Sequence, residues 1–147
     1  SFNDYFCYRT MKNLFYFLLV LMSCNSCKDK GNYNVPYVPV NITINVNQPT
    51  FFNLTVTGGW VYVTGGSRGI IVYRKSQTEF VAIERHSTYQ VENQCAVVVS
   101  GDGVLINDPC SASQWLITDG SIVNGPTAAP LVTYDTSFND PILTIMN

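Results

Sequence analysis

Histidine is nearly absent from this chain of 147 residues, and cysteine is sparse. The single histidine is His86, and of the five cysteines only Cys95 and Cys110 lie beyond residue 30. Zinc sites with four cysteines, or with two cysteines and two histidines, need more ligands than this later part contains. An iron–sulfur cluster held by four cysteines within it is excluded for the same reason.

Charge is also scarce, because charged residues make up 12% of the chain and the formal net charge is −2. The chain has no run of lysines and arginines, which argues against a nucleic-acid-binding surface. The glycine pairs at 58–59 and 65–66 lack the Gly-Lys-Ser/Thr ending of a phosphate loop, and no helical pattern follows them. We therefore interpret both pairs as hairpin turns.

An apolar run long enough to span a bilayer as a helix is missing near the N-terminus. In "MKNLFYFLLVLMSC", one lysine precedes the short apolar run Leu14 to Met22, and the small residue Ser23 follows it. This order predicts a secretory signal. We interpret residues 1–10 as an upstream extension and residues 11–23 as a lipoprotein signal peptide.

The end of this segment, "LMSC", resembles the lipobox of bacterial lipoproteins. The resemblance implies that Cys24 becomes the lipid-bearing first residue of the mature chain. A plain signal peptide that is cut nearby is the alternative, and Cys27 is a second candidate for the lipid. Residues 24–39 would then form the lipidated N-terminus and a polar linker, which Pro36 and Pro39 stiffen.

Residues 40–147 show the pattern of one all-β domain. In "NITINVN", Ile42, Ile44 and Val46 alternate with polar residues, which is typical of a half-buried strand. Similar short runs separated by glycine and proline follow to the C-terminus, and no window has a sustained helical period. "TFFNLTVTGGWVYVTGGSRGIIVYRK" alone supplies three runs. Short strands with frequent turns predict an antiparallel β-sandwich or small barrel.

Two cysteines within a domain of an exported chain can form a disulfide or remain free thiols. In an oxidising compartment Cys95 and Cys110 are expected to form a disulfide, and two buried free thiols are the alternative. A bridge that closes a loop of this length would stabilise the fold by about 3 kcal/mol in the chain-entropy model. We favour the disulfide.

Catalytic arrangements have little support in the sequence. A hydrolase that uses His86 would need a hydroxyl and a carboxylate at its ring, but the neighbouring Ser87 would point to the opposite face of a strand. No Gly-x-Ser-x-Gly elbow is present. The carboxylate pairs that acid–base catalysis would use are Glu84 with Glu92 and Asp102 with Asp108. Nothing in the sequence sets their separation, so we expect solvated loop groups.

Three stretches carry a resemblance to a known family. They are "GIIVYRKSQTEFVAIERHSTYQ", "DPCSASQW" and "DGSIVNGPTAAPLVTY". Together they resemble the strands, the second ligand loop and the following segment of a Rieske [2Fe–2S] domain, whose second loop reads Cys-Pro-Cys-His-Gly-Ser-x-Phe. The chain looks most like small lipoprotein variants of Bacteroidota. The resemblance implies a Rieske-like all-β fold with two loops at its tip.

The resemblance also implies where the cluster ligands would stand. The first loop's cysteine and histidine positions hold Ser87 and Tyr89, and those of the second loop hold Asp108 and Ser111. All four ligands are changed, and hard oxygen ligands do not suit an iron–sulfide core. Cys110 takes the place of the middle cysteine, which in respiratory members forms a disulfide between the two loops. Its partner here would be Cys95.

These observations lead to one functional hypothesis. We expect a non-catalytic, lipid-anchored protein of the outer membrane, on its periplasmic or surface face, without a cofactor. Its partners would be the membrane through the lipid, and an envelope protein or further copies of itself, with loops 87–90 and 108–113 as the contact surface. The alternatives are an electron-transfer protein with a [2Fe–2S] cluster of unorthodox or intermolecular ligation, and a hydrolase that uses His86.

Overall fold

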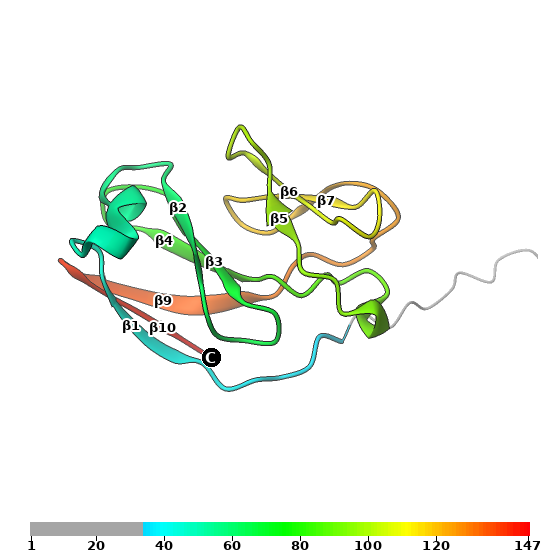
Figure 1. Cartoon of the computed structure of the whole chain (residues 1–147), viewed down its shortest axis with the longest axis horizontal. Coiled ribbons are helices and arrows are strands. Elements are labelled where there is room, and N and C mark those ends of the chain that lie inside the picture. Colours follow the sequence, from blue (N-terminus) through cyan, green and yellow to red (C-terminus); the bar gives the residue numbers. More distant parts are fainter. Residues whose placement is uncertain (1–33) are drawn as a thin grey trace, which may run out of the picture. The chain divides into compact units, whose positions relative to one another are not determined.

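The computed structural model describes residues 34–147, which form β-strands and short 3-10 segments (Figure 1). No helix in this part of the chain is long and apolar enough to cross a membrane. The predicted upstream extension, signal peptide and lipid site at Cys24, with its alternative Cys27, lie outside the described residues. So does the first part of the predicted linker.

The larger sheet has six strands in the order β1-β10-β9-β4-β3-β2, and every neighbouring pair is antiparallel. The strands are β1 (Asn41–Asn45), β2 (Trp60–Val63), β3 (Ile70–Arg74), β4 (Phe80–Glu84), β9 (Thr133–Asn139) and β10 (Ile142–Met146). Each is short and rich in β-branched or aromatic residues, as expected for strands that pack on one or both faces. The predicted all-β antiparallel class is confirmed.

The smaller sheet is inserted between two neighbouring strands of the larger one. Its order is β5-β6-β7-β8, with β5 (Val98–Val99), β6 (Leu105–Asn107), β7 (Gln114–Leu116) and β8 (Ile122–Asn124). The chain leaves the larger sheet after β4 and returns in β9, which pairs with β4 through Ala82↔Tyr134 and Ile83↔Thr133. Both ends of the insertion are therefore fixed on adjacent strands.

The two faces of β3 serve two hydrophobic cores. Ile70 and Val72 are fully buried in the core of the larger sheet, while Ile71 lies in the core that includes Ile106 and Trp115 of the smaller sheet. Successive side chains of a strand point to opposite faces, so one strand can contribute to both. This shared strand couples the insertion to the larger sheet.

One predicted run in "TFFNLTVTGG" is wrong. Residues Pro49–Thr55 form a 3-10 segment, η2, in place of a strand. Proline at its first turn has the φ that a helical turn needs, and Leu54 is the buried residue of this segment, whereas Phe52 is 70% exposed. A second 3-10 segment, η3 (Val91–Asn93), lies in the loop that follows β4.

Candidate functional site

The two predicted ligand loops lie together and are joined by a disulfide. The first loop follows β4 and contains η3, and the second connects β6 with β7. Cys95 and Cys110 form the bridge, with 6.3 Å between their Cα atoms, so the predicted pairing is confirmed. His86 and Ala96 form an isolated antiparallel bridge within the first loop. The disulfide holds the first loop against the second, and the bridge pairs the two ends of the first loop with each other.

The Rieske resemblance assigns four positions to cluster ligands. Three of them are hydrogen-bonded together through the carboxylate of Asp108. Asp108 is 4% exposed, and its Oδ2 accepts hydrogen bonds from Ser87 Oγ at 2.8 Å and Ser111 Oγ at 2.7 Å. Its Oδ1 accepts from the backbone N–H of Cys110 at 2.9 Å. These three donors compensate the burial of the charge without a cation. We call Ser87, Asp108 and Ser111 the oxygen cluster.

The fourth position, Tyr89, joins the oxygen cluster only through its backbone. Its amide donates to Ser87 Oγ at 3.1 Å, and its phenol makes no hydrogen bond among the described residues. A third segment closes the cluster from the other side, because the amide of Thr127 donates to Ser113 Oγ, which lies 3.0 Å from Ser111 Oγ. The cluster is thus a packed polar network of three loops.

A second buried carboxylate, Glu84, lies at the end of β4 and is 1% exposed. Its Oε2 accepts from Tyr134 Oη at 2.6 Å and from the amide of Ser67 at 2.7 Å. Its Oε1 accepts from the amides of Arg68 and His86, both at 2.9 Å. Burial, together with the hydrogen bond to Glu84 and its negative charge, raises the pKa of Tyr134 well above its ordinary value.

Glu84 and Asp108 correct one expectation from the sequence. Both were expected to be solvated loop carboxylates, and both are buried and fully hydrogen-bonded. For Glu84 no local pattern indicates this burial, because its donors come from three separate segments of the chain. Only the fold brings Ser67, Glu84 and Tyr134 together.

The ring of His86 is enclosed between two hydrogen-bond partners. Nε2 lies 2.8 Å from the carbonyl oxygen of Val91, which can only accept, so Nε2 carries a proton. Nδ1 lies 2.8 Å from Ser67 Oγ. The residue is 1% exposed. The hydroxyl at the ring is that of Ser67 and not Ser87, and Glu84 contacts the backbone of His86 instead of its ring, so the ring acts as a structural link between loops.

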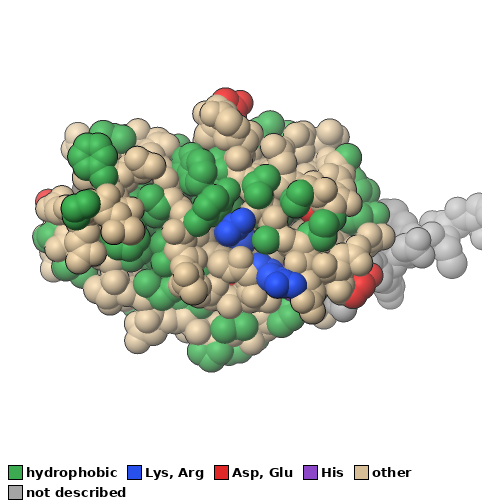
Figure 2. All heavy atoms as spheres, viewed as in Figure 1, with side chains coloured by type: hydrophobic (Ala, Val, Ile, Leu, Met, Phe, Trp, Pro, Cys, Tyr) green, Lys and Arg blue, Asp and Glu red, His purple; other side chains and the backbone are tan. Residues whose placement is uncertain are grey.

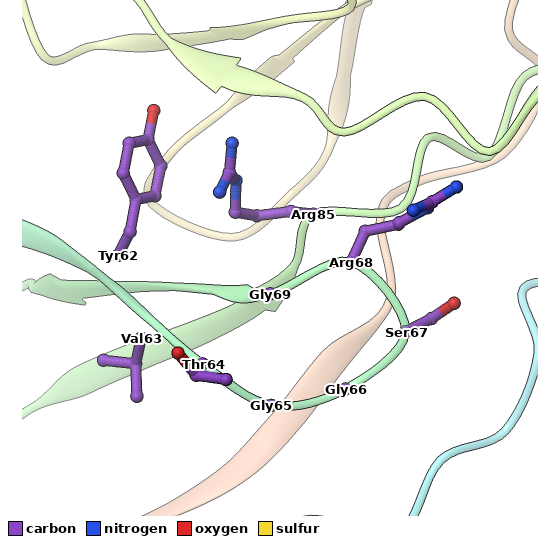
Figure 3. Close-up of a pocket in the computed structure, with 9 residues that line it drawn as sticks. All are labelled: Tyr62, Val63, Thr64, Gly65, Gly66, Ser67, Arg68, Gly69 and Arg85. Carbon is purple, nitrogen blue, oxygen red and sulfur yellow. The ribbon is translucent and has the colours of Figure 1, made fainter.

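A pocket of about 500 Å³ lies beside the loop that connects β2 and β3 (Figure 3). Its lining consists of Tyr62, Val63, Thr64, Gly65, Gly66, Ser67, Arg68, Gly69 and Arg85. The glycine pair at 65–66 lies in a hairpin turn, as predicted, whereas the pair at 58–59 connects η2 with β2 and is not a hairpin turn. Arg68 and Arg85 were not predicted as site residues. Arg68 follows the glycine pair and Arg85 follows strand β4, and only the fold brings both into the lining of one pocket.

No protein-family model matches the chain, and no curated protein does. Among solved structures, the chain is similar to the ferredoxin of carbazole 1,9a-dioxygenase from Nocardioides aromaticivorans IC177. The identity is 15% and the TM-score is 0.49, over 75% of this chain and 98% of that chain.

Proposed function

We propose that this protein contains a Rieske-like domain without an iron–sulfur cluster and acts as a non-catalytic binding or structural component. The observation that carries the proposal is the oxygen cluster. The Asp108 carboxylate stands where the sequence resemblance puts a ligand cysteine, and it is bonded to Ser87 and Ser111, which stand at two other ligand positions.

The chemistry of the available donors supports this proposal. A Rieske iron needs two neutral imidazoles, and the chain has one histidine, whose ring nitrogens already face Ser67 and Val91. The thiols of Cys95 and Cys110 are consumed in the disulfide. Carboxylate and hydroxyl oxygens favour hard cations and suit an iron–sulfide core poorly. The loops therefore have hydrogen bonds and a disulfide where an active member of the family would have a metal centre.

Attachment to the membrane through Cys24 is part of the proposal. The signal-like order of residues 11–24 supports it, with Cys27 as the second candidate for the lipid. The protein would then be held at the outer membrane by acyl chains. Its partner would be an envelope protein or another copy of this chain.

The contact surface of this component would include the two disulfide-bonded loops. Their buried members form the oxygen cluster, while Gln90, Pro109, Cys110 and Ala112 are exposed. A rigid loop pair costs little conformational entropy when it binds, which favours a recognition role.

Metal analysis of the purified protein tests the central part of the proposal. We expect no bound iron, no acid-labile sulfide and no visible absorbance of the iron–sulfur type in protein purified without oxygen. An electron carrier that shares a cluster across two chains is the competing function, because two chains together have four thiols in Cys95 and Cys110. It would show stoichiometric iron once the disulfide is reduced.

A further inference from the structure

Positively charged side chains line the pocket beside the β2–β3 loop, although the described part of the chain contains few of them. The lysines and arginines of the described residues are Arg68, Arg74, Lys75 and Arg85. Two of these four line this pocket, and no aspartate or glutamate does. On the face in Figure 2, basic side chains lie next to one another near the middle, while acidic ones are mostly seen toward the edges. The pocket is therefore a candidate site for an anion.

Arg85 is held in place with part of its guanidinium free. Its Nε donates to the carbonyl oxygen of Val97 at 3.0 Å, and its Cζ lies 4.0 Å from the ring centroid of Tyr62. The Tyr62 hydroxyl in turn accepts from the amide of Val99 at 3.0 Å. The two terminal nitrogens of Arg85 make no hydrogen bond among the described residues. A fixed guanidinium with two free donors matches the two oxygens of a carboxylate.

In Figure 3 the side chain of Arg85 extends toward Tyr62, and that of Arg68 extends away from both. One terminal nitrogen of Arg68 donates to the side-chain oxygen of Gln94 in the first loop, and its remaining guanidinium nitrogens make no hydrogen bond in the described part of the chain. Neither arginine forms an ion pair there. Both charges are thus available to a ligand.

The loop between β2 and β3 also contributes backbone N–H groups. The amides of Gly65 and Gly66 donate no hydrogen bond within residues 34–147. The next two amides, of Ser67 and Arg68, are fixed on the Glu84 carboxylate. Glu84 is the nearby negative charge that opposes an anion, but four donors already compensate it. The pocket therefore has N–H donors without partners among the described residues and no acidic side chain in its lining.

The neighbouring strand indicates what kind of molecule carries the anion. β2 is an edge strand of the larger sheet, and its residues Tyr62 and Val63 line the pocket. An edge strand offers unpaired backbone groups to an extended segment of another chain. Tyr62 is 41% exposed and offers an aromatic surface beside the guanidinium of Arg85.

We propose that this pocket binds a carboxylate side chain from an extended acidic segment of a partner polypeptide that lies along β2. Arg85 would hold the carboxylate through its two terminal nitrogens, and Arg68 would attract a second acidic residue of the same segment. The inference rests on the proposed binding role and names the chemistry of the partner.

Nuclear magnetic resonance of the full-length, 15N-labelled protein tests the inference. The probe is a synthetic six-residue peptide of alternating glutamate and valine, and the same peptide with lysine for glutamate is the control. We expect the acidic peptide to shift the amides of residues 61–69 and the Arg85 Nε resonance, and the basic peptide to leave them unchanged. Added salt should weaken the binding.

Matched variants locate the binding. Arg85→Gln should raise the dissociation constant by roughly 10- to 100-fold, as expected for the loss of a charged hydrogen-bond pair. Lys75→Gln, which removes the same charge outside this pocket, should change it less than about twofold. Arg68→Gln gives a second test if Arg85→Gln unfolds the protein, and it should also weaken the binding.

Three results would overturn the inference. They are no shift in the loop, equal weakening by Arg85→Gln and Lys75→Gln, and equal shifts from acetate or inorganic phosphate at the same concentration, which would mean a non-selective anion site. None of them bears on the iron content, so a failure here is distinguishable from a failure of the proposed function.

Discussion

At the scale of single residues, the buried carboxylates of Glu84 and Asp108 organise the hydrogen bonds of the loops around them. Glu84 has four donors and Asp108 has three, and neither has a cationic side chain as partner among residues 34–147. A buried charge without enough donors would be strongly destabilising. Each network therefore depends on its central carboxylate more than on any one donor.

Removal of the Asp108 carboxylate should destabilise the domain. In Asp108→Ala the hydroxyls of Ser87 and Ser111 and the amide of Cys110 lose their acceptor while the disulfide remains, so we expect a loss of roughly 2 to 4 kcal/mol. Urea denaturation measures the free energy of unfolding. Asp135→Ala, at an exposed position, is the control and should stay within about 0.5 kcal/mol of the wild type. Equal small effects would show that the oxygen cluster contributes little.

Tyr134 should make stability depend on pH in the alkaline range. Its pKa is raised in the folded state, so the unfolded chain loses the phenolic proton first as the pH rises. The contribution of Tyr134 is fully present below about pH 10 and declines above it. Denaturation at pH 8 and above pH 10 should show a smaller decline for Tyr134→Phe than for the wild type. Identical declines would mean that Tyr134 ionises in the folded protein as it does when unfolded.

At the scale of elements, hydrogen bonds from the amides of Ser67 and Arg68 to the Glu84 carboxylate fix the β2–β3 loop. Gly66 has φ +60°, and a Cβ there would lie 2.1 Å from Glu84 Oε2 and 2.5 Å from the Tyr134 hydroxyl. Those atoms are held in place by hydrogen bonds to each other and to the loop. The loop and the end of β4 therefore form one unit, from which Arg68 extends toward the first ligand loop.

Two glycine variants separate steric contact from backbone strain. Gly58 also has a positive φ, +87°, but a Cβ there meets nothing within 4 Å. Gly58→Ala should cost about 1 kcal/mol through backbone strain alone, and Gly66→Ala should cost at least ~1 kcal/mol more. Thermal unfolding of both variants measures the difference. Equal effects would show that Glu84 and Tyr134 move aside easily.

The disulfide should stabilise the contact between the two ligand loops in addition to the hydrogen bonds of Asp108. Cys95 and Cys110 are separated by 15 positions in the sequence, and loss of such a bridge costs about 3 kcal/mol in the chain-entropy model. The variant Cys95→Ala/Cys110→Ala should therefore unfold at a lower denaturant concentration than the oxidised wild type. A reductant should lower the midpoint of the wild type and leave that of the double variant unchanged. A reductant effect of the same size on both proteins would contradict this account.

Prediction from sequence reached the strands, the loops and the disulfide between them, but not the hydrogen bonds that join distant segments. The alternation of Ile42 and Ile44 indicates a strand because period two is a local property of the chain. The 3-10 turn at Pro49 was missed because its aromatic residues look like those of a strand. The contacts that Glu84 makes to Ser67 and Tyr134 join segments far apart in the chain, so no local pattern could reveal them.

At the scale of the whole molecule, two antiparallel sheets and a pair of loops form the described part of the chain. A six-stranded sheet holds a smaller sheet and two disulfide-bonded loops, and the smaller sheet is inserted between two adjacent strands. We propose that this scaffold persists without a metal centre because Asp108 and the disulfide hold the loops together. The positively charged pocket would then be a separate place for binding.

The most direct test of the central claim is the iron and acid-labile sulfide content per chain of full-length protein purified without oxygen, with and without reduction of the disulfide. The account predicts neither iron nor sulfide above background in both preparations, and no visible iron–sulfur absorbance. Stoichiometric iron with matching sulfide in either preparation would contradict it.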